Sequence, residues 1–369
     1  MASYLSTLRN DVARWRAAGL IDARTGEALL RDAEASHGRG ISFGSVLSVL
    51  AAVLVGAALL LFVAANWEAF PRMARVALIF VGILVGYVGG AALKARGHAG
   101  LGEALWLLAA VAFGAGIALV AQMYQLSGDE AQAVLVWCAG TALAAIALRS
   151  HPLTVGAVLL AGAWLLMTAT AAGTHDQAPL SWLALAAVLW AVSLWTDSSP
   201  SRHLLLLSAM VFAWLVYVDS DSLRAPAILA AVSVAAFALG IWRPDESDRI
   251  LRLDGALPVH GLLGFIAGMS AIQFEYYDEP EFVYVAIAVF AGVVAALVLA
   301  GRSGRMLRWL AYAAFVYELG FVYIALIGTM LDTASFFLAA GLVLALVAVV
   351  ITRIERRMAA AAAAAGGRP

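Results

Sequence analysis

A run of 23 residues without a charge, Phe43–Ala65, is the feature that most limits what this chain can fold into. A helix crosses a bilayer core with about 20 apolar residues, and its backbone groups are all hydrogen-bonded internally. Similar runs recur, since 64% of the residues are hydrophobic, 13% are charged and the mean hydropathy is +0.92. The runs show no sustained alternation of period two, which argues against an outer-membrane barrel. The sequence therefore predicts an all-α, polytopic transmembrane helical bundle.

The apolar runs predict about twelve spans. They lie near residues 43–65, 74–93, 104–123, 131–148, 152–171, 180–195, 203–218, 225–242, 257–274, 282–300, 307–327 and 334–351. With the N-terminus inside, all but three of the 23 Lys and Arg residues fall on cytoplasmic segments, as the positive-inside rule describes. The pattern predicts an even number of spans with both termini in the cytoplasm. Because nearly all the basic residues are Arg, which is typical of a GC-rich bacterial genome, we expect a multi-pass protein of the bacterial cytoplasmic (inner) membrane.

Composition divides the chain into four regions. They are a polar cytoplasmic helical segment at 1–40, membrane regions of four and eight spans at 41–150 and 151–352, and a basic, Ala-rich cytoplasmic tail at 353–369. In the first region Val12 and Trp15 have helical spacing, Gly19 ends that helix, and Asp22 is placed to cap a second one. We interpret this hairpin as a docking or orientation element, or alternatively as a contact for an unknown cytoplasmic protein partner.

Glu318 is the most costly residue to place in a bilayer. It stands about midway through the span near 307–327, where an ionisable group costs about 2.5–3.5 kcal/mol on insertion scales. Ala311, Ala314 and Ala325 share its helical face, and a stripe of small residues lets a second helix approach closely. We therefore expect Glu318 to face protein rather than lipid. It is either a proton or cation site or a protonated packing residue.

Gln122 is the second candidate for an intramembrane polar site. Gly114, Ala115 and Ala118 share its face near the outer end of the third span. A buried amide in this position either bridges two helices or lines a polar site. In the loop that follows, Ser127 and Glu130 have the S-x-x-E spacing of a capping box that would start the fourth span.

Three polar segments end odd-numbered spans on the predicted outer face. Their side chains are candidates for a shared vestibule, and they are Asn66, Trp67, Glu68, Tyr124, Asp129, Gln273 and Glu275. Repeated helical hairpins build such vestibules in transporters. Independent anchoring at the membrane interface gives the same pattern, and Asn66 is also suited to ending a helix.

Common chemical signatures are missing from the sequence. It has no GxxxxGK[ST], HExxH or GxSxG motif. The six histidines fall at loops or span edges with no pair at i,i+4, and Cys138 is the only cysteine. We therefore predict no catalytic residue, no cofactor, no metal site and no nucleic-acid partner. The predicted surroundings are the lipid bilayer.

Three strings in the first half carry a family resemblance. They are WRAAGLID before the first span, FVAANWEAFPRMARV at its end, and GAGIALVAQMYQLSGDEAQAVLVW across the third and fourth spans. Over roughly residues 5–150 the chain resembles the bacterial membrane-protein family called domain of unknown function 2157. The resemblance implies an integral membrane protein and brings no established activity.

Two functions from different classes fit the sequence. The first is a secondary transporter or channel-like protein, because of the number of spans and the position of Glu318. The alternative is a non-catalytic membrane sensor or scaffold that uses residues 1–40 as its cytoplasmic contact. An enzyme acting on lipid or cell-wall precursors has less support, because no paired acid–base constellation stands out.

Overall fold

The computed structural model describes residues 11–37, 69–125, 128–170, 180–299 and 305–325, with the single positions 54, 61, 65, 338, 341 and 345. All regular secondary structure in these residues is helical. The predicted all-α class is therefore confirmed for the described part of the chain. The chain divides into two compact units, Met1–Leu78 and Ile79–Pro369.

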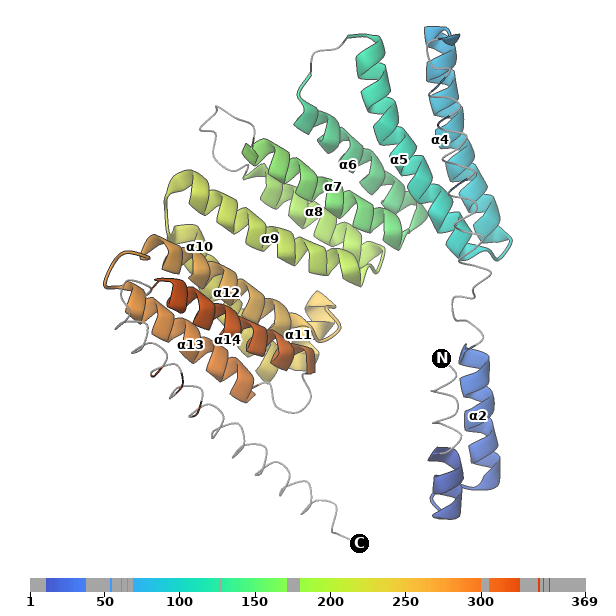
Figure 1. Cartoon of the computed structure of the whole chain (residues 1–369). Helices are drawn as coiled ribbons and strands as arrows, with labels where there is room; N and C mark the ends of the chain where they lie inside the picture. Colours follow the sequence, from blue (N-terminus) through green and yellow to red (C-terminus); the bar gives the residue numbers. More distant parts are fainter. Residues whose placement is uncertain are drawn as a thin grey trace. The chain divides into compact units, whose positions relative to one another are not determined.

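The first unit contains a helical hairpin (Figure 1). A short helix over residues 11–17 is followed by α2 (Ala23–His37). Between them Gly19 has φ +69°, a conformation in which a side chain would be strained. Val12 is 2% exposed, and its Cγ1 lies 3.1 Å from the place where Gly26 would carry a Cβ. The two helices therefore touch through a valine and a glycine.

Asp22 caps α2, as the sequence predicts. The backbone N–H of Thr25 donates to Oδ1 of Asp22 at 3.0 Å. Hydrogen bonds from the side chain and the backbone of Thr25 lower the pKa of Asp22 from its ordinary value of 3.8. A carboxyl whose pKa is lowered by folding stabilises the fold above its unfolded pKa, and this contribution is lost as the pH falls through the lowered value.

We expect Asp22→Ala to loosen the first turn of α2, because the N–H of Thr25 loses its acceptor, whereas Asp22→Asn keeps a side-chain oxygen. The measurement is the amide hydrogen exchange of Thr25 in the full-length protein. At neutral pH the exchange should be faster in the alanine variant and close to wild type in the asparagine variant. Below pH 3.8 the gap between wild type and alanine should shrink. Equal exchange in all three proteins at neutral pH would contradict the cap.

The remaining helices run from the end of the first unit through the second. They are α4 (Arg72–Ala95), α5 (Ala99–Met123), α6 (Glu130–Leu148), α7 (His151–Thr170), α8 (Ser181–Trp195), α9 (Ser199–Ser220), α10 (Arg224–Trp242), α11 (Pro244–Leu251), α12 (Leu257–Glu275), α13 (Phe282–Leu299) and α14 (Arg305–Ala325). Among the described residues nine helices are long and apolar enough to cross a membrane, and α8 is a shorter apolar helix. Each predicted span from 74–93 to 307–327 falls on one of these helices. The spans predicted near 43–65 and 334–351 lie outside the described residues.

Helix α11 is a helix that the span pattern does not predict. It is eight residues long and polar, with the sequence PDESDRIL. Its local signals are nevertheless those of a helix: a proline in the first turn, Asp245 and Glu246 beside it, and Arg249 in the last turn. Arg252 ends the helix in the left-handed conformation. A search for apolar runs misses such a segment, because its hydrophobic content is low.

Helix α12 is the centre of the packing in the last part of the chain. It contacts α9, α10, α13 and α14, and 61% of its most apolar 18-residue stretch is buried. Its closest neighbour is α10, which lies beside it in Figure 1. A Cβ added to Gly261 would lie 2.7 Å from the backbone nitrogen of Phe237, and one added to Gly268 would lie 2.7 Å from the carbonyl oxygen of Pro226. The two backbones approach this closely because glycines face α10.

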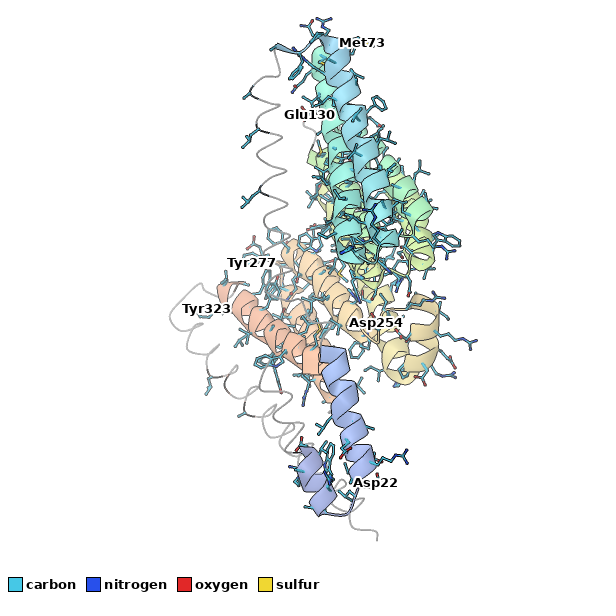
Figure 2. The ribbon with its side chains drawn as sticks, turned by 90° about the vertical axis from the view of Figure 1, so that its right-hand side faces the viewer. Asp22, Met73, Glu130, Asp254, Tyr277 and Tyr323 are labelled. Atoms are coloured by element: carbon cyan, nitrogen blue, oxygen red, sulfur yellow. The ribbon has the colours of Figure 1, made fainter. Side chains whose placement is uncertain are left out.

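Large apolar side chains cover the outside of the helices. Leu84, Val85 and Val88 of α4 are each 60–62% exposed, and Figure 2 shows side chains projecting along this helix from Met73 onward. Soluble monomers rarely expose continuous apolar surface on this scale. Such a surface suits a lipid environment, so the chain is a membrane protein with several apolar helices.

Candidate functional site

Gln273 of α12 and Glu318 of α14 form a buried polar pair. Both side chains are 0% exposed. The Nε2 amide group of Gln273 donates to Oε1 of Glu318 at 2.6 Å. Ala311 and Ala314 on the same face of α14 are also buried, so Glu318 faces protein, as the stripe of alanines predicts. The sequence singles out both residues, but it does not place them together.

Each member of the pair keeps an oxygen for which the described residues supply no partner. Oε2 of Glu318 and Oε1 of Gln273 are buried and accept no hydrogen bond from the described residues. A buried acceptor left in this way costs about 1–3 kcal/mol, and native structures contain few of them. The pair therefore presents three oxygens, of which one is already hydrogen-bonded. A proton or a small cation is the kind of group that would satisfy the other two.

The surroundings of the pair are apolar. Toward the N-terminus of α14, Ala314 and Phe315 belong to one core cluster, and toward its C-terminus Val322 belongs to another. Phe290 packs against both clusters. Charge interactions are stronger in such a low-dielectric environment than in water. An ionised Glu318 would therefore hold a proton or a counter-cation tightly.

Gln122, the second predicted intramembrane residue, lies elsewhere. Its side chain is exposed, in the last turn of α5. Helix α5 packs against α6 and α7, whereas Glu318 lies on α14 and faces α12. The structure therefore does not bring Gln122 and Glu318 into one site.

The α5–α6 connection contains two of the predicted vestibule residues. Tyr124 is the C-cap of α5 and is 50% exposed. Asp129 is the N-cap of α6, where its Oδ1 accepts from the N–H of Ala131 at 2.8 Å. The N-cap is thus Asp129 rather than the predicted Ser127, which lies outside the described residues. Asp129 stands directly before the helix, has an extended backbone and carries the oxygen that accepts the hydrogen bond.

The other vestibule residues divide between two faces of α12 or lie outside the described residues. Glu275 accepts a hydrogen bond from the hydroxyl of Tyr217 in α9 at 2.8 Å, while Gln273 turns to Glu318. Two residues along a helix rotate by about 200°, so neighbours of this spacing point apart. The segment 66–68 lies outside the described residues, and a shared vestibule remains a prediction.

A pair of histidines is the main polar feature that sequence reasoning misses. Nδ1 of His203 in α9 lies 2.7 Å from Nε2 of His260 in α12, and the two rings stack with centroids 5.0 Å apart. The residues are 57 positions apart, so a search for i,i+4 pairs cannot find them. Two imidazoles are too few for a metal centre, and no group of three His, Cys, Asp or Glu side chains that would hold a metal occurs in the described part of the chain.

A second missed cluster ties three helices together. Glu103 of α5 forms an ion pair with Lys94 of α4 and accepts a hydrogen bond from the hydroxyl of Ser150, just before α7. The ammonium of Lys94 also lies 4.3 Å from the ring centroid of Trp106. The cluster pairs its charges internally, which is typical of a structural contact.

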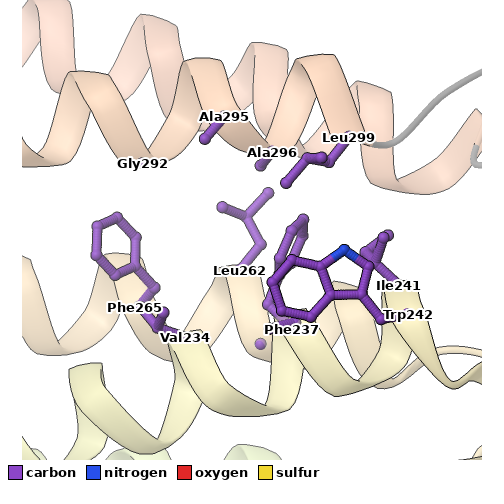
Figure 3. A pocket seen from close by; sticks show the side chains of 12 residues that line it. Val234, Phe237, Ile241, Trp242, Leu262, Phe265, Gly292, Ala295, Ala296 and Leu299 are labelled. Carbon is purple, nitrogen blue, oxygen red and sulfur yellow. The ribbon is translucent and has the colours of Figure 1, made fainter.

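An apolar pocket of about 220 Å³ lies between α10, α12 and α13. Figure 3 shows Phe265 beside Gly292 of α13, and Trp242 at the other end of the pocket, toward Leu299. All of its lining residues are aliphatic, aromatic or glycine. It offers no carboxylate, amide or hydroxyl to orient a polar ligand, so it does not compete with the Glu318 pair as a polar binding site.

Comparison with known proteins finds no match among curated proteins and none among solved structures. A family model does match the first part of the chain. Residues 13–154 match the family described as "Predicted membrane protein (DUF2157)", which is the family that the sequence resembles.

Proposed function

We propose that this protein moves protons or small monovalent cations across the membrane, as a secondary transporter or channel-like protein, and that Glu318 and Gln273 bind the ion. One observation carries the proposal. A carboxyl group and an amide group are fully buried side by side, and each keeps an oxygen that has no partner in the described part of the chain. Ionisable residues at membrane depth are expensive to place and mark ion pathways.

The chemistry of the pair suits an exchangeable positive charge. A carboxylate in an apolar interior is stable only with its charge neutralised, either by a proton or by a cation. The amide group of Gln273 supplies both a hydrogen-bond donor for the carboxylate and an oxygen ligand for a cation. Its N–H holds Oε1 of Glu318 in place, and its own oxygen lies ready to bind the incoming cation. Binding and release would then switch the site between a neutral and a charged state.

The proposal includes a membrane orientation. We place twelve spans in the bacterial cytoplasmic membrane with both termini in the cytoplasm, because nearly all basic residues then lie on the inner side. In this arrangement α12 begins on the cytoplasmic side and ends on the outer side. Gln273, in the last turn of α12, then lies nearer the outer side.

The test is ion flux into vesicles that contain the purified protein, followed with dyes for H⁺, Na⁺ and K⁺. We expect flux above that of protein-free vesicles for at least one ion, and we expect Glu318→Gln to bring it down to the protein-free level. The substitution preserves shape and removes the charge, so a folding defect is not expected. Glu281→Gln, which removes an exposed acid next to α13, is the matched control and should keep the flux.

Gln122→Ala separates the two intramembrane candidates. Because Gln122 is exposed on α5, we expect this variant to retain wild-type flux, while Gln273→Ala loses most of it. Two results would refute the proposal: wild-type flux at the protein-free level for all three ions, or a wild-type flux that Glu318→Gln leaves unchanged. Loss of flux in Gln122→Ala alone would move the site to α5.

A further inference from the structure

Four side chains form a continuous hydrogen-bonded line at the start of α9 and α12. Oδ2 of Asp254 lies 2.5 Å from Oγ of Ser199. The same Oγ lies 3.3 Å from Nε2 of His203. Nδ1 of His203 then lies 2.7 Å from Nε2 of His260. The line therefore joins α9 to the α11–α12 connection and to the start of α12, which lie 55 and 57 residues further along the sequence.

The line runs from the protein surface into its interior. Asp254 is exposed, beside α11 (Figure 2). Ser199 and His203 are half-buried, and His260 is 8% exposed. At the inner end Nδ1 of His260 is buried and has no hydrogen-bond partner among the described residues. The last atom of the line is thus a free nitrogen that faces the interior.

The hydrogen atoms have only one consistent arrangement when Asp254 is ionised and both histidines are neutral. The hydroxyl of Ser199 has a single hydrogen, and it donates to Asp254. Nε2 of His203 must then donate to Oγ of Ser199, which leaves Nδ1 of a neutral His203 as an acceptor. Nε2 of His260 must donate to that acceptor, which leaves Nδ1 of His260 bare. All three bonds therefore point the same way, toward Asp254.

We infer that this line is a proton-transfer chain between the exposed carboxylate of Asp254 and the buried Nδ1 of His260. When a proton binds Nδ1 of His260, the Nε2 proton of His260 passes to Nδ1 of His203. The Nε2 proton of His203 then passes to Ser199, and the hydroxyl proton of Ser199 passes to Asp254. The exposed Asp254 then releases its proton to the solvent. One proton thus enters at the buried end and one leaves at the surface, so charge and atoms balance. The reverse sequence carries a proton inward.

The charged groups around the chain hold it in place without entering it. Arg202, next to His203, donates from Nε to the carbonyl of Arg252 at 2.9 Å and from Nη1 to the carbonyl of Ser193 at 3.0 Å. Asp248 of α11 accepts from the N–H of Gly255 at 2.9 Å. These contacts fix the connection that carries Asp254. Arg202 is also the cation nearest to the chain on α9, and the carboxylates that act on it electrostatically are Asp197, Asp248 and Asp254.

The chain lies toward the opposite end of α12 from the Glu318 pair. Gln273 is 13 residues beyond His260, which is about 20 Å along a helix. The idea that this proton-transfer chain supplies protons to Glu318 rests on the proposed function. The idea that protons exchange along it rests only on the distances given above.

The test is the exchange of the Nε2 proton of His260 with solvent, measured by nitrogen-15 NMR on the full-length protein with labelled histidine in lipid bilayers. The bond directions predict that both His203 and His260 carry their proton on Nε2. A positioned proton carrier contributes about 10²–10⁴-fold to a transfer rate, so Ser199→Ala should slow the exchange by about 100-fold or more. Asp254→Asn should slow it as well. Ser208→Ala, a half-buried serine of α9 outside the line, is the matched control and should leave it unchanged.

Two results would overturn the proposal of a proton-transfer chain. One is a proton on Nδ1 of His203 in the wild-type protein, and the other is unchanged exchange in Ser199→Ala. Flux measurements on the same variants separate the chain from the proposed function. Slowed exchange in a protein that moves no ion supports the chain and refutes the function. Normal proton flux with unchanged exchange in Ser199→Ala refutes the chain and leaves the function standing.

Discussion

Replacing Arg202 with alanine is expected to lower the free energy of unfolding by about 3–6 kcal/mol, because two hydrogen bonds from a charged donor are lost, each worth about 1.5–3 kcal/mol. The side chain is 2% exposed. Its two bonds join α9 to the carbonyl of Ser193 at the end of α8 and to the carbonyl of Arg252 at the end of α11. The measurement is denaturant unfolding of the purified protein in mixed micelles.

Two further variants identify the cause of the expected loss. Arg202→Lys keeps the charge but lacks the fork of N–H donors that reaches both carbonyls, so we expect roughly half of the destabilisation. Arg243→Ala removes an arginine whose ion pair with Glu246 is 62–63% exposed, and such pairs contribute less than about 1 kcal/mol. If Arg202→Ala and Arg243→Ala unfold at the same denaturant concentration, the junction of α9 with α8 and α11 is not what stabilises the fold.

The glycines of α12 give the second large expected effect. Gly261→Ala and Gly268→Ala each place a methyl group 2.7–2.9 Å from backbone atoms of α10. A backbone does not yield as a side chain tip does, and overpacking of this kind costs about 1–3 kcal/mol per site. The two sites are two helical turns apart, about 10 Å, where effects usually add. We expect the double variant to be less stable than wild type by about 2–6 kcal/mol in the same unfolding measurement.

Gly320→Ala in α14 is the matched control for both substitutions. Among the residues that the structure describes, no heavy atom lies within 4 Å of the place where its Cβ would be. Replacing a helical glycine with alanine in open space stabilises the helix by up to about 1 kcal/mol. The same chemical change is therefore expected to have opposite signs on α12 and α14. A stabilised or unchanged double variant on α12 would show that α10 and α12 are less tightly packed than these distances require.

Most of the helices could be predicted from the sequence, because a membrane span needs a long apolar run and little else. The runs from 74–93 to 307–327 all fall on helices. The burial of Glu318 also follows from local spacing, since its alanine neighbours mark the face that meets another helix. Helix α11 escapes the same method because its residues are polar.

The partners of the polar residues could not be predicted in this way. Gln273 and Glu318 are 45 positions apart, and His203 and His260 are 57 apart. Periodicity reports which face of a helix is buried, but not which other helix meets it. The order in which helices pack against each other is decided by tertiary contacts, such as the glycine face of α12. For this reason Gln273 is predicted from the sequence as part of an outer vestibule, and no role is predicted for the histidines.

Helix α12 also links two polar contacts mechanically. His260 lies in its first turn and Gln273 in its last turn, and each bonds to a different neighbour, α9 and α14. A helix with its hydrogen bonds intact moves as a rigid rod, so a slight turn about its axis changes both bonds at once. Against α10 the helix presents a face that includes glycines, where the two backbones approach closely. A rotation of α12 that changes the His203–His260 distance therefore also changes the Gln273–Glu318 distance, although the two polar pairs do not touch.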